Sequence, residues 1–175
     1  MQTALVVEVP AADPVAGPWR ARFDRAAAAG VPAHVTVCFP FLPPAEVDED
    51  ALARLAAGTE PFVVTLGRTG TFGDAVLWLD PEPAGPFREL TRAVTAAFGV
   101  LPYGGAHGDP VPHLTVAEDP DDLAAVRADV ERRLPLTQRV EALTLLQGEF
   151  VPAGWRVRRR FPLGQGSGAG AAGPV

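Results

Sequence analysis

The chain contains no lysine, a single cysteine and no apolar run of transmembrane length. The lack of lysine, alongside abundant alanine, glycine and proline, is typical of a GC-rich genome and indicates no function. With Cys38 alone, no intrachain disulfide can form, which fits a reducing compartment. The first apolar run stops at Glu8 and no basic segment precedes it, so a strand is expected here and not a signal peptide. We therefore expect a soluble, cytoplasmic protein without membrane contacts.

Positive charge is also scarce. The 15 arginines are outnumbered by 21 acidic residues, which gives a net charge of −6. Proteins that hold a long nucleic-acid strand gain affinity by neutralising its phosphates with a basic face. The composition thus predicts no binding to a long nucleic-acid tract. A nucleotide substrate would be small, or only one end of a strand would enter the site.

The length of 175 residues suits one domain, and 47% hydrophobic residues are enough to bury a core. We expect a single domain over residues 1–163, followed by a disordered glycine- and alanine-rich tail over residues 164–175. Helix starts are expected at Asp13-Pro14, Pro43-Pro44, Pro86 and Asp119-Pro120, and helix ends at Gly30, Gly58 and Gly99. The expected strands are residues 3–9, 34–39, 62–68, 75–80, 113–117, 138–147 and 155–161.

This order of elements contains a repeat. After a leading strand, the series helix, strand, helix, strand, strand occurs twice, over about 14–82 and 86–163. Trp78 follows His34 by 44 residues (78 − 34), and Trp155 follows His113 by 42 (155 − 113). The expected fold class is α+β and bilobal, with two antiparallel-rich sheets flanked by helices around a central cleft.

Both copies of the repeat contain the pattern H-x-T-V, as His34-Val35-Thr36-Val37 and as His113-Leu114-Thr115-Val116. Alternate residues of a strand share a face, so each motif presents an imidazole and a hydroxyl on one side and an apolar pair on the other. Two imidazoles can act as general base and general acid near neutral pH, and hydroxyls can hold phosphate oxygens. A single copy would indicate only a strand, whereas the paired copies predict one shared catalytic site.

Other residues give weaker signals. Tyr103 and His107 lie in a glycine-rich loop before the second motif, where they would either contact substrate or belong to a solvated loop. Arg156, Arg158 and Arg160 alternate on the last expected strand and would share a face, for which solvent is favoured over the cleft. Cys38 would share the face of His34 and Thr36, as a small packed residue.

The paired motifs and the order of elements from Thr3 to Phe161 resemble the 2H phosphoesterase superfamily, which includes 2′-5′ RNA ligases and RNA 2′,3′-cyclic phosphodiesterases. Phe39 matches an aromatic residue that often follows the first motif. Many bacterial relatives carry arginine where this chain has Glu118. The resemblance implies metal-independent hydrolysis of a 2′,3′-cyclic phosphate on a nucleotide or RNA end, with 2′-5′ ligation as the reverse reaction. It also implies that His34 and His113 serve as base and acid, and that Thr36 and Thr115 bind phosphate.

Two alternatives remain at this point. One is a non-catalytic module of the same fold that binds a nucleotide or another phosphorylated ligand. The other is a metallohydrolase with zinc on His34, His107 and His113, although their spacing matches no common ligand pattern. The favoured interpretation requires no cofactor and no metal, and a monomer is expected. It also requires both imidazoles and both threonine hydroxyls to surround a space about one phosphate wide.

Overall fold

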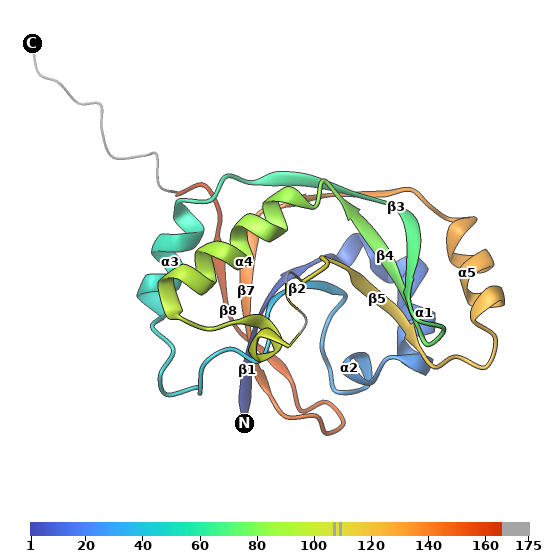
Figure 1. Cartoon of the computed structure of the whole chain (residues 1–175), viewed down its shortest axis with the longest axis horizontal. Coiled ribbons are helices and arrows are strands. Elements are labelled where there is room, and N and C mark those ends of the chain that lie inside the picture. The colour runs from blue at the N-terminus through green and yellow to red at the C-terminus, as the bar shows by residue number, and fades with distance from the viewer. Residues whose placement is uncertain (107, 109, 166–175) are drawn as a thin grey trace, which may run out of the picture.

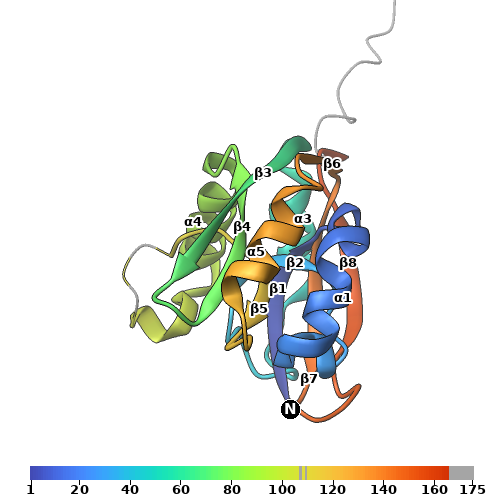
Figure 2. The same cartoon turned by 90° about the vertical axis from the view of Figure 1, so that its right-hand side faces the viewer.

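The strands form two four-stranded antiparallel sheets (Figures 1 and 2), as predicted. The computed structural model describes residues 1–106, 108 and 110–165. The first sheet has the order β2-β1-β7-β8, with β1 Gln2–Glu8, β2 His34–Cys38, β7 Ala142–Gly148 and β8 Arg156–Pro162. The second has the order β5-β4-β3-β6, with β3 Phe62–Phe72, β4 Val76–Glu82, β5 Leu114–Glu118 and β6 Leu136–Val140.

Helices cover the outside of both sheets (Figure 1). They are α1 Asp13–Phe23, α2 Arg25–Ala28, α3 Glu49–Ala57, α4 Gly85–Phe98 and α5 Leu123–Glu131, with short 3-10 helices η1 Pro10–Ala12 and η2 Pro102–Gly105. Helices α3 and α4 pack on the first sheet, against β8 and β2, whereas α1 and α5 pack on the second, against β5 and β3. Helix α1 follows a strand of the first sheet and packs on the second, and α4 does the converse, which ties the two sheets together.

The sheet orders reveal how the repeat is arranged. The two orders match when β2 is set against β5, β1 against β4 and β7 against β3. In the first unit, β1 and α1 precede the H-x-T-V strand β2, and β3 then joins the second sheet. In the second unit, β4 and α4 precede the H-x-T-V strand β5, and β7 then joins the first sheet. The two structural units therefore start with β1 and with β4. The repeat predicted from the sequence started one element later, at the helix that follows each of these strands.

Three predicted helices differ from the structure at one end. The helix expected to run to Gly30 breaks at Asp24, whose backbone is extended and whose carboxylate caps the N-terminus of α2 by accepting from Ala26 N. The helix expected at Pro43-Pro44 begins only at Glu49, because Asp48 provides the N-terminal cap. Similarly, α5 is capped by Asp122 and does not start at Asp119-Pro120.

The long strand expected over residues 138–147 is two strands. It divides at Glu141, so that β6 pairs with β3 and β7 pairs with β1. No glycine, proline, asparagine or aspartate stands at this crossing to signal a turn, so the sequence indicated one continuous strand. The predicted turn over residues 69–74 is also shorter, since β3 continues to Phe72 and the turn follows it.

Strand alternation places the core between the sheets and their helices. Val35, Val37, Leu114 and Val116 from the two motifs are buried, with at most 1% of each residue exposed. Gly164 at the start of the predicted tail donates its N–H to the Thr59 carbonyl, while residues 166–175 lie outside the described part of the chain. Within the described residues, no helix has the length and apolar character needed to cross a membrane.

A glycine in β3 makes room for a tryptophan beside the site. A Cβ atom on Gly70 would lie 2.3 Å from Cζ2 of Trp78, so Gly70→Ala must displace this indole. We expect the substitution to lower the free energy of unfolding by about 1–3 kcal/mol, measured by urea denaturation. Gly17→Ala in α1 is the matched control, because its Cβ would approach nothing closer than 4.0 Å. Equal stability of both variants and the native chain would show that Trp78 does not pack over Gly70.

Candidate functional site

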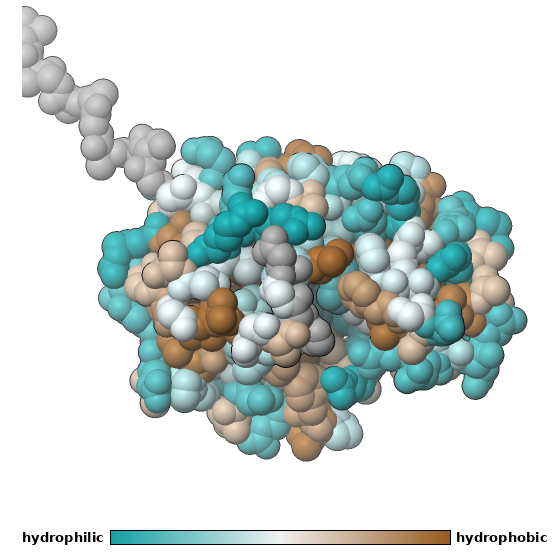
Figure 3. All heavy atoms as spheres, in the orientation of Figure 1, coloured by the Kyte–Doolittle hydropathy of each residue, from teal (hydrophilic) through white to brown (hydrophobic). Residues whose placement is uncertain are grey.

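The two H-x-T-V strands lie side by side at the centre of the molecule (Figures 1 and 2). Each is an edge strand of its own sheet, and the sheets present these edges to each other. A cleft of about 590 Å³ lies between them, and Figure 3 shows a hollow on this face bordered by apolar side chains. Its walls include the four motif side chains that were predicted to converge, His34, Thr36, His113 and Thr115.

The pairing of the strands explains which motif residues reach the cleft. His34 and Thr36 lie opposite Glu8 and Val6 of β1, and Thr115 lies opposite Trp78 of β4. The register of both pairs shifts next to the motif threonine. Such an irregularity adds one residue to a strand and reverses the alternation beyond it.

The shifted register corrects the position predicted for Cys38. It was expected on the face of His34 and Thr36, but it is fully buried in the core, as is its counterpart Ala117. Its expected role as a packed residue agrees with this burial, and burial also raises the pKa of its thiol to about 11. The residues after these two, Phe39 and Glu118, return to the cleft wall.

Both histidines are held in the same way. Nδ1 of His34 lies 2.8 Å from the Pro32 carbonyl oxygen, and Nδ1 of His113 lies 2.7 Å from the Val111 carbonyl oxygen. Because a carbonyl oxygen only accepts, Nδ1 carries a proton in each ring. In the neutral form Nε2 then has the lone pair, so both rings offer the same nitrogen for proton transfer.

Burial makes both imidazoles weak bases when the cleft is empty. It lowers the pKa of His34 to about 4, although the hydrogen bond to the Pro32 carbonyl opposes this shift. It lowers the pKa of His113 as well, again against a backbone hydrogen bond. Each group releases its proton as pH rises through its lowered pKa, so both rings are neutral at pH 7. An anion between them would favour the charged form and raise both pKa values.

The two histidines have different surroundings. The ring of His113 packs edge-on against Phe72, with centroids 4.8 Å apart, and lies 6.2 Å from Trp78. His34 instead follows a segment held by a buried ion pair, in which Arg20 Nε donates to Asp24 Oδ2 at 2.9 Å. The same guanidinium donates to the Val31 carbonyl oxygen. The ion pair thereby fixes the chain just before the carbonyl that holds His34.

An aromatic cluster forms one wall of the cleft. Phe39 makes edge-on contacts with Tyr103, Phe150 and Trp155 at centroid distances of 6.4, 5.9 and 5.9 Å. Tyr103 is half-buried, and its backbone N–H donates to the Phe39 carbonyl oxygen at 2.7 Å. Burial raises the pKa of the Tyr103 hydroxyl, and a hydrogen bond with the Thr36 side chain opposes this rise. Phe39 and Tyr103, both predicted as weak candidates, therefore line the site.

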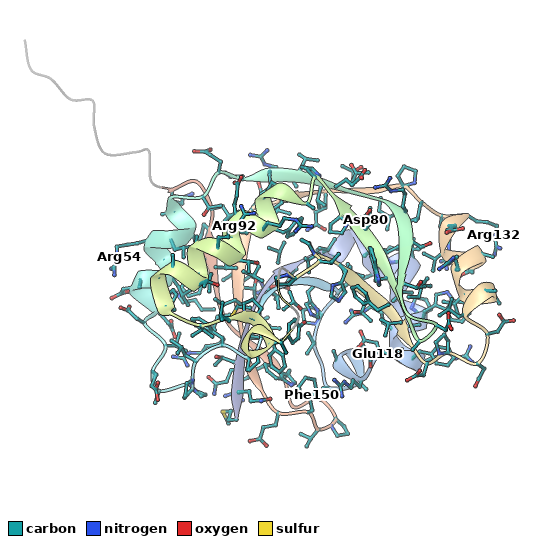
Figure 4. All side chains as sticks on the ribbon, in the orientation of Figure 1. Arg54, Asp80, Arg92, Glu118, Arg132 and Phe150 are labelled. Atoms are coloured by element: carbon teal, nitrogen blue, oxygen red, sulfur yellow. The ribbon has the colours of Figure 1, made fainter. Side chains whose placement is uncertain are left out.

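One ion pair lies at the edge of the cleft. Arg25, at the start of α2, lies with its Nε 3.8 Å from Oε2 of Glu118 at the end of β5. The guanidinium also lies over the Phe150 ring, 5.6 Å from its centroid. Glu118 and Phe150 are labelled in Figure 4, on the side of the molecule near α2. This contact joins α2 to the end of β5.

The arginines of β8 lie elsewhere. Arg158 donates to Glu49 and to the Pro44 carbonyl oxygen, and Arg156 is exposed; neither lines the cleft. A register shift near Arg158 also separates the face of Arg156 from that of Arg160, which pairs with Glu8. The predicted common face of the three arginines is therefore wrong, although solvent was the favoured environment.

His107 lies outside the described residues, so its predicted contact stays a prediction. Among the residues that the structure describes, no three His, Cys, Asp or Glu side chains come close enough together to hold a metal ion.

Among the residues that line the cleft but were not predicted are Arg25, Phe72, Phe150 and Trp155. Trp155 was identified only as a repeat marker. Phe150 offered a signal, because an aromatic residue in a turn rich in glycine and proline has no strand partner to explain it. Arg25 offered none, since one charged residue in a predicted helix is indistinguishable from a solvated side chain.

The fold and the paired H-x-T-V strands define the class of two-histidine phosphoesterases. The family model of the 2′-5′ RNA ligase superfamily matches residues 7–150, and the chain belongs to this superfamily. This confirms the resemblance inferred from the motifs. No curated protein matches the chain in sequence.

Solved structures show the same fold. E. coli LigT complexed with NADP+ has a TM-score of 0.61 and 20% identity, over 93% of this chain and 96% of LigT. E. coli LigT complexed with 3′-AMP has a TM-score of 0.62 and 20% identity, over 93% and 97% of the two chains. The protein TT0787 of Thermus thermophilus has a TM-score of 0.63 and 22% identity, over 94% and 98%. At these identities the likeness establishes the fold alone.

Burial of the imidazoles predicts their titration. In the ligand-free protein, NMR should show His34 titrating near pH 4 and His113 below its ordinary value of 6.5. Inorganic phosphate should raise both values, because an anion stabilises imidazolium. A His34→Asn variant assigns the resonances. Titration of both rings at or above pH 6.5 without phosphate would contradict the described burial.

Proposed function

We propose that this protein is a metal-independent phosphodiesterase that hydrolyses 2′,3′-cyclic phosphates of nucleotides or RNA ends. One observation carries the proposal: His34, Thr36, His113 and Thr115 all line one cleft. Their matched backbone hydrogen bonds leave Nε2 of both rings for proton transfer. A base and an acid of the same type, beside two hydroxyls, suit in-line displacement at phosphorus.

The chemistry needs one neutral and one protonated imidazole. The neutral ring takes a proton from water through Nε2 while the water oxygen forms a bond to phosphorus. The bond from phosphorus to the 2′ or 3′ oxygen breaks, and the protonated ring donates its proton to that oxygen. One water is consumed and a phosphomonoester forms. Each positioned acid or base contributes roughly 10²–10⁴ to the rate.

Binding of the anionic substrate favours the protonated imidazole that this chemistry needs. Both imidazoles are neutral at pH 7 in the empty cleft, because burial lowers each pKa. The anionic phosphate raises the pKa of the adjacent rings, so binding favours uptake of the proton that the acid requires. Thr36 and Thr115 donate to the non-bridging oxygens and hold the group in line. In 2′-5′ ligation the same groups act on a 5′-hydroxyl in place of water: its oxygen forms the bond to phosphorus, the bond to the 3′ oxygen breaks, and the protonated ring donates its proton to that oxygen.

Relatives support a nucleotide as the substrate. LigT of E. coli has been solved with 3′-AMP, NADP+, ATP and phosphate. Hydrolysis of adenosine 2′,3′-cyclic phosphate yields 3′-AMP when the bond from phosphorus to the 2′ oxygen breaks. For this chain we infer the same class of ligand.

His34→Ala and His113→Ala should each lower kcat on 2′,3′-cyclic AMP by about 10² or more, because each removes an acid or base. Urea unfolding should show that both variants stay folded. Arg156→Ala, an exposed change outside the cleft, is the control and should keep full activity. A histidine variant with near-native kcat would disprove the two-histidine mechanism. Binding without turnover by the native protein, with or without added metals, would favour the non-catalytic module, whereas loss of activity in chelator would favour a metallohydrolase.

The pH dependence of kcat/KM should reflect the free protein. The acid must be protonated, and its lowered pKa means that this form is lost as pH rises through a value below 6.5. We expect kcat/KM for 2′,3′-cyclic AMP to be maximal below pH 6.5 and to fall by up to about tenfold per pH unit above it. A constant kcat/KM between pH 6 and 9 would contradict the assignment of an imidazolium as the acid.

A further inference from the structure

We propose that the cleft selects a single nucleoside 2′,3′-cyclic phosphate, with one negative charge, over the cyclic-phosphate end of an RNA chain. This inference rests on the proposed function and narrows its substrate class. The charges along the cleft, the arginines outside it and an exposed aromatic ring carry the argument.

The cleft has almost no positive charge to offer. Among the described residues that line it, the charged side chains are Asp24, Arg25 and Glu118. Asp24 is 4% exposed and already paired with Arg20. Arg25 is opposed by Glu118 at 3.8 Å. One phosphate between the imidazoles gains its counter-charge by protonation of a ring, but a second or third phosphate would find no unopposed cation in these walls.

The shallow groove beside the cleft does not provide a basic path either. Its walls include Arg22 and Arg25, but also Glu118 and Asp119. Arg22 lies over the Phe23 ring, 4.9 Å from its centroid. Asp24 lines this groove as well, so a strand leaving the cleft this way meets three carboxylates and two guanidinium groups, whereas binding of a nucleic-acid backbone depends on an excess of cations.

Four further arginines lie outside the cleft. Arg158 and Arg159 pair with Glu49 on α3. Arg54 and Arg132 lie towards opposite ends of the molecule in Figure 4. None of these four arginines lines the cleft, so they supply no cation for a second phosphate there.

The aromatic wall of the cleft offers a binding surface for the nucleobase, which the few charged side chains do not. Phe150 is 48% exposed, although it contacts Phe39 and lies 5.4 Å from Trp155 between ring centroids. An exposed ring at the mouth of a cleft can stack with a nucleobase, and the guanidinium of Arg25 lies beside it. The volume of about 590 Å³ is within the range of small-molecule sites, about 300–1,000 Å³. Stacking of the base on Phe150 and binding of one phosphate between the imidazoles are enough to hold a mononucleotide, with no further contact to a charged group.

The decisive experiment compares two substrates with the same reacting end. We expect kcat/KM for 2′,3′-cyclic AMP to exceed that for an oligoadenylate with a 2′,3′-cyclic phosphate end by about tenfold or more. Raising the salt from about 50 to 200 mM should change kcat/KM of the oligonucleotide by less than about threefold, since few phosphates are neutralised. Equal or higher kcat/KM for the oligonucleotide, or a steep loss with salt, would overturn the inference.

One substitution and a matched control test the role of charge at the cleft edge. Glu118→Arg makes the charge at the cleft edge two units more positive and should reduce the preference for the mononucleotide at least threefold. Glu141→Arg makes the same change of charge at an exposed site outside the cleft and should leave the preference unchanged. An unchanged preference in Glu118→Arg, or an equal reduction in Glu141→Arg, would refute the role of local charge.

Phe150→Ala should raise KM for 2′,3′-cyclic AMP about fivefold with kcat nearly unchanged, and Phe150→Tyr should restore it. Native KM in Phe150→Ala would exclude stacking on this ring. The two proposals fail differently. If no 2′,3′-cyclic phosphate is hydrolysed, the proposed function is wrong, whereas hydrolysis that favours the oligonucleotide overturns only the selectivity.

Discussion

The alternation of side chains along two adjacent edge strands is the constraint on which the site depends. Strand β2, and β5 together with His113 just before it, each bury an apolar pair in the core and turn a histidine and a threonine to the cleft. Because the two sheets present these edges to each other, the same burial that stabilises the core also aims the polar pairs at one place. A slip of one residue in either strand would exchange the two faces and remove half of the site.

The apolar character of the cleft has two consequences that belong together. It lowers the pKa of both imidazoles, and it offers aromatic surface beside them. A site of this kind is uncharged at rest and becomes charged when an anion enters. The buried Arg20–Asp24 pair and the backbone carbonyls hold the rings in place meanwhile, so little reorganisation accompanies the uptake of a proton.

Much of the fold and the centre of the site could be predicted because the evidence is local. Asp-Pro and glycine signals indicated the helices, alternation indicated the strands, and the repeated H-x-T-V pattern identified His34 and His113. The predictions were wrong where a side-chain cap or a distant strand partner decides: the carboxylate of Asp24 caps α2 and ends the first helix early, and the chain crosses between sheets at Glu141. The register shifts that bury Cys38 and return Phe39 to the cleft depend on pairing with β1.

The sequence by itself determined the chemical groups and their period: two imidazole-hydroxyl pairs, each on one face of a strand, in a chain with little positive charge. Only the tertiary structure decided what surrounds them. It placed Phe150 and Arg25 at the mouth, paired Arg25 with Glu118, and paired Arg158 of β8 with Glu49 outside the cleft. The reason is physical, since strand periodicity is a property of neighbouring residues, whereas burial and charge pairing depend on residues far apart in the chain.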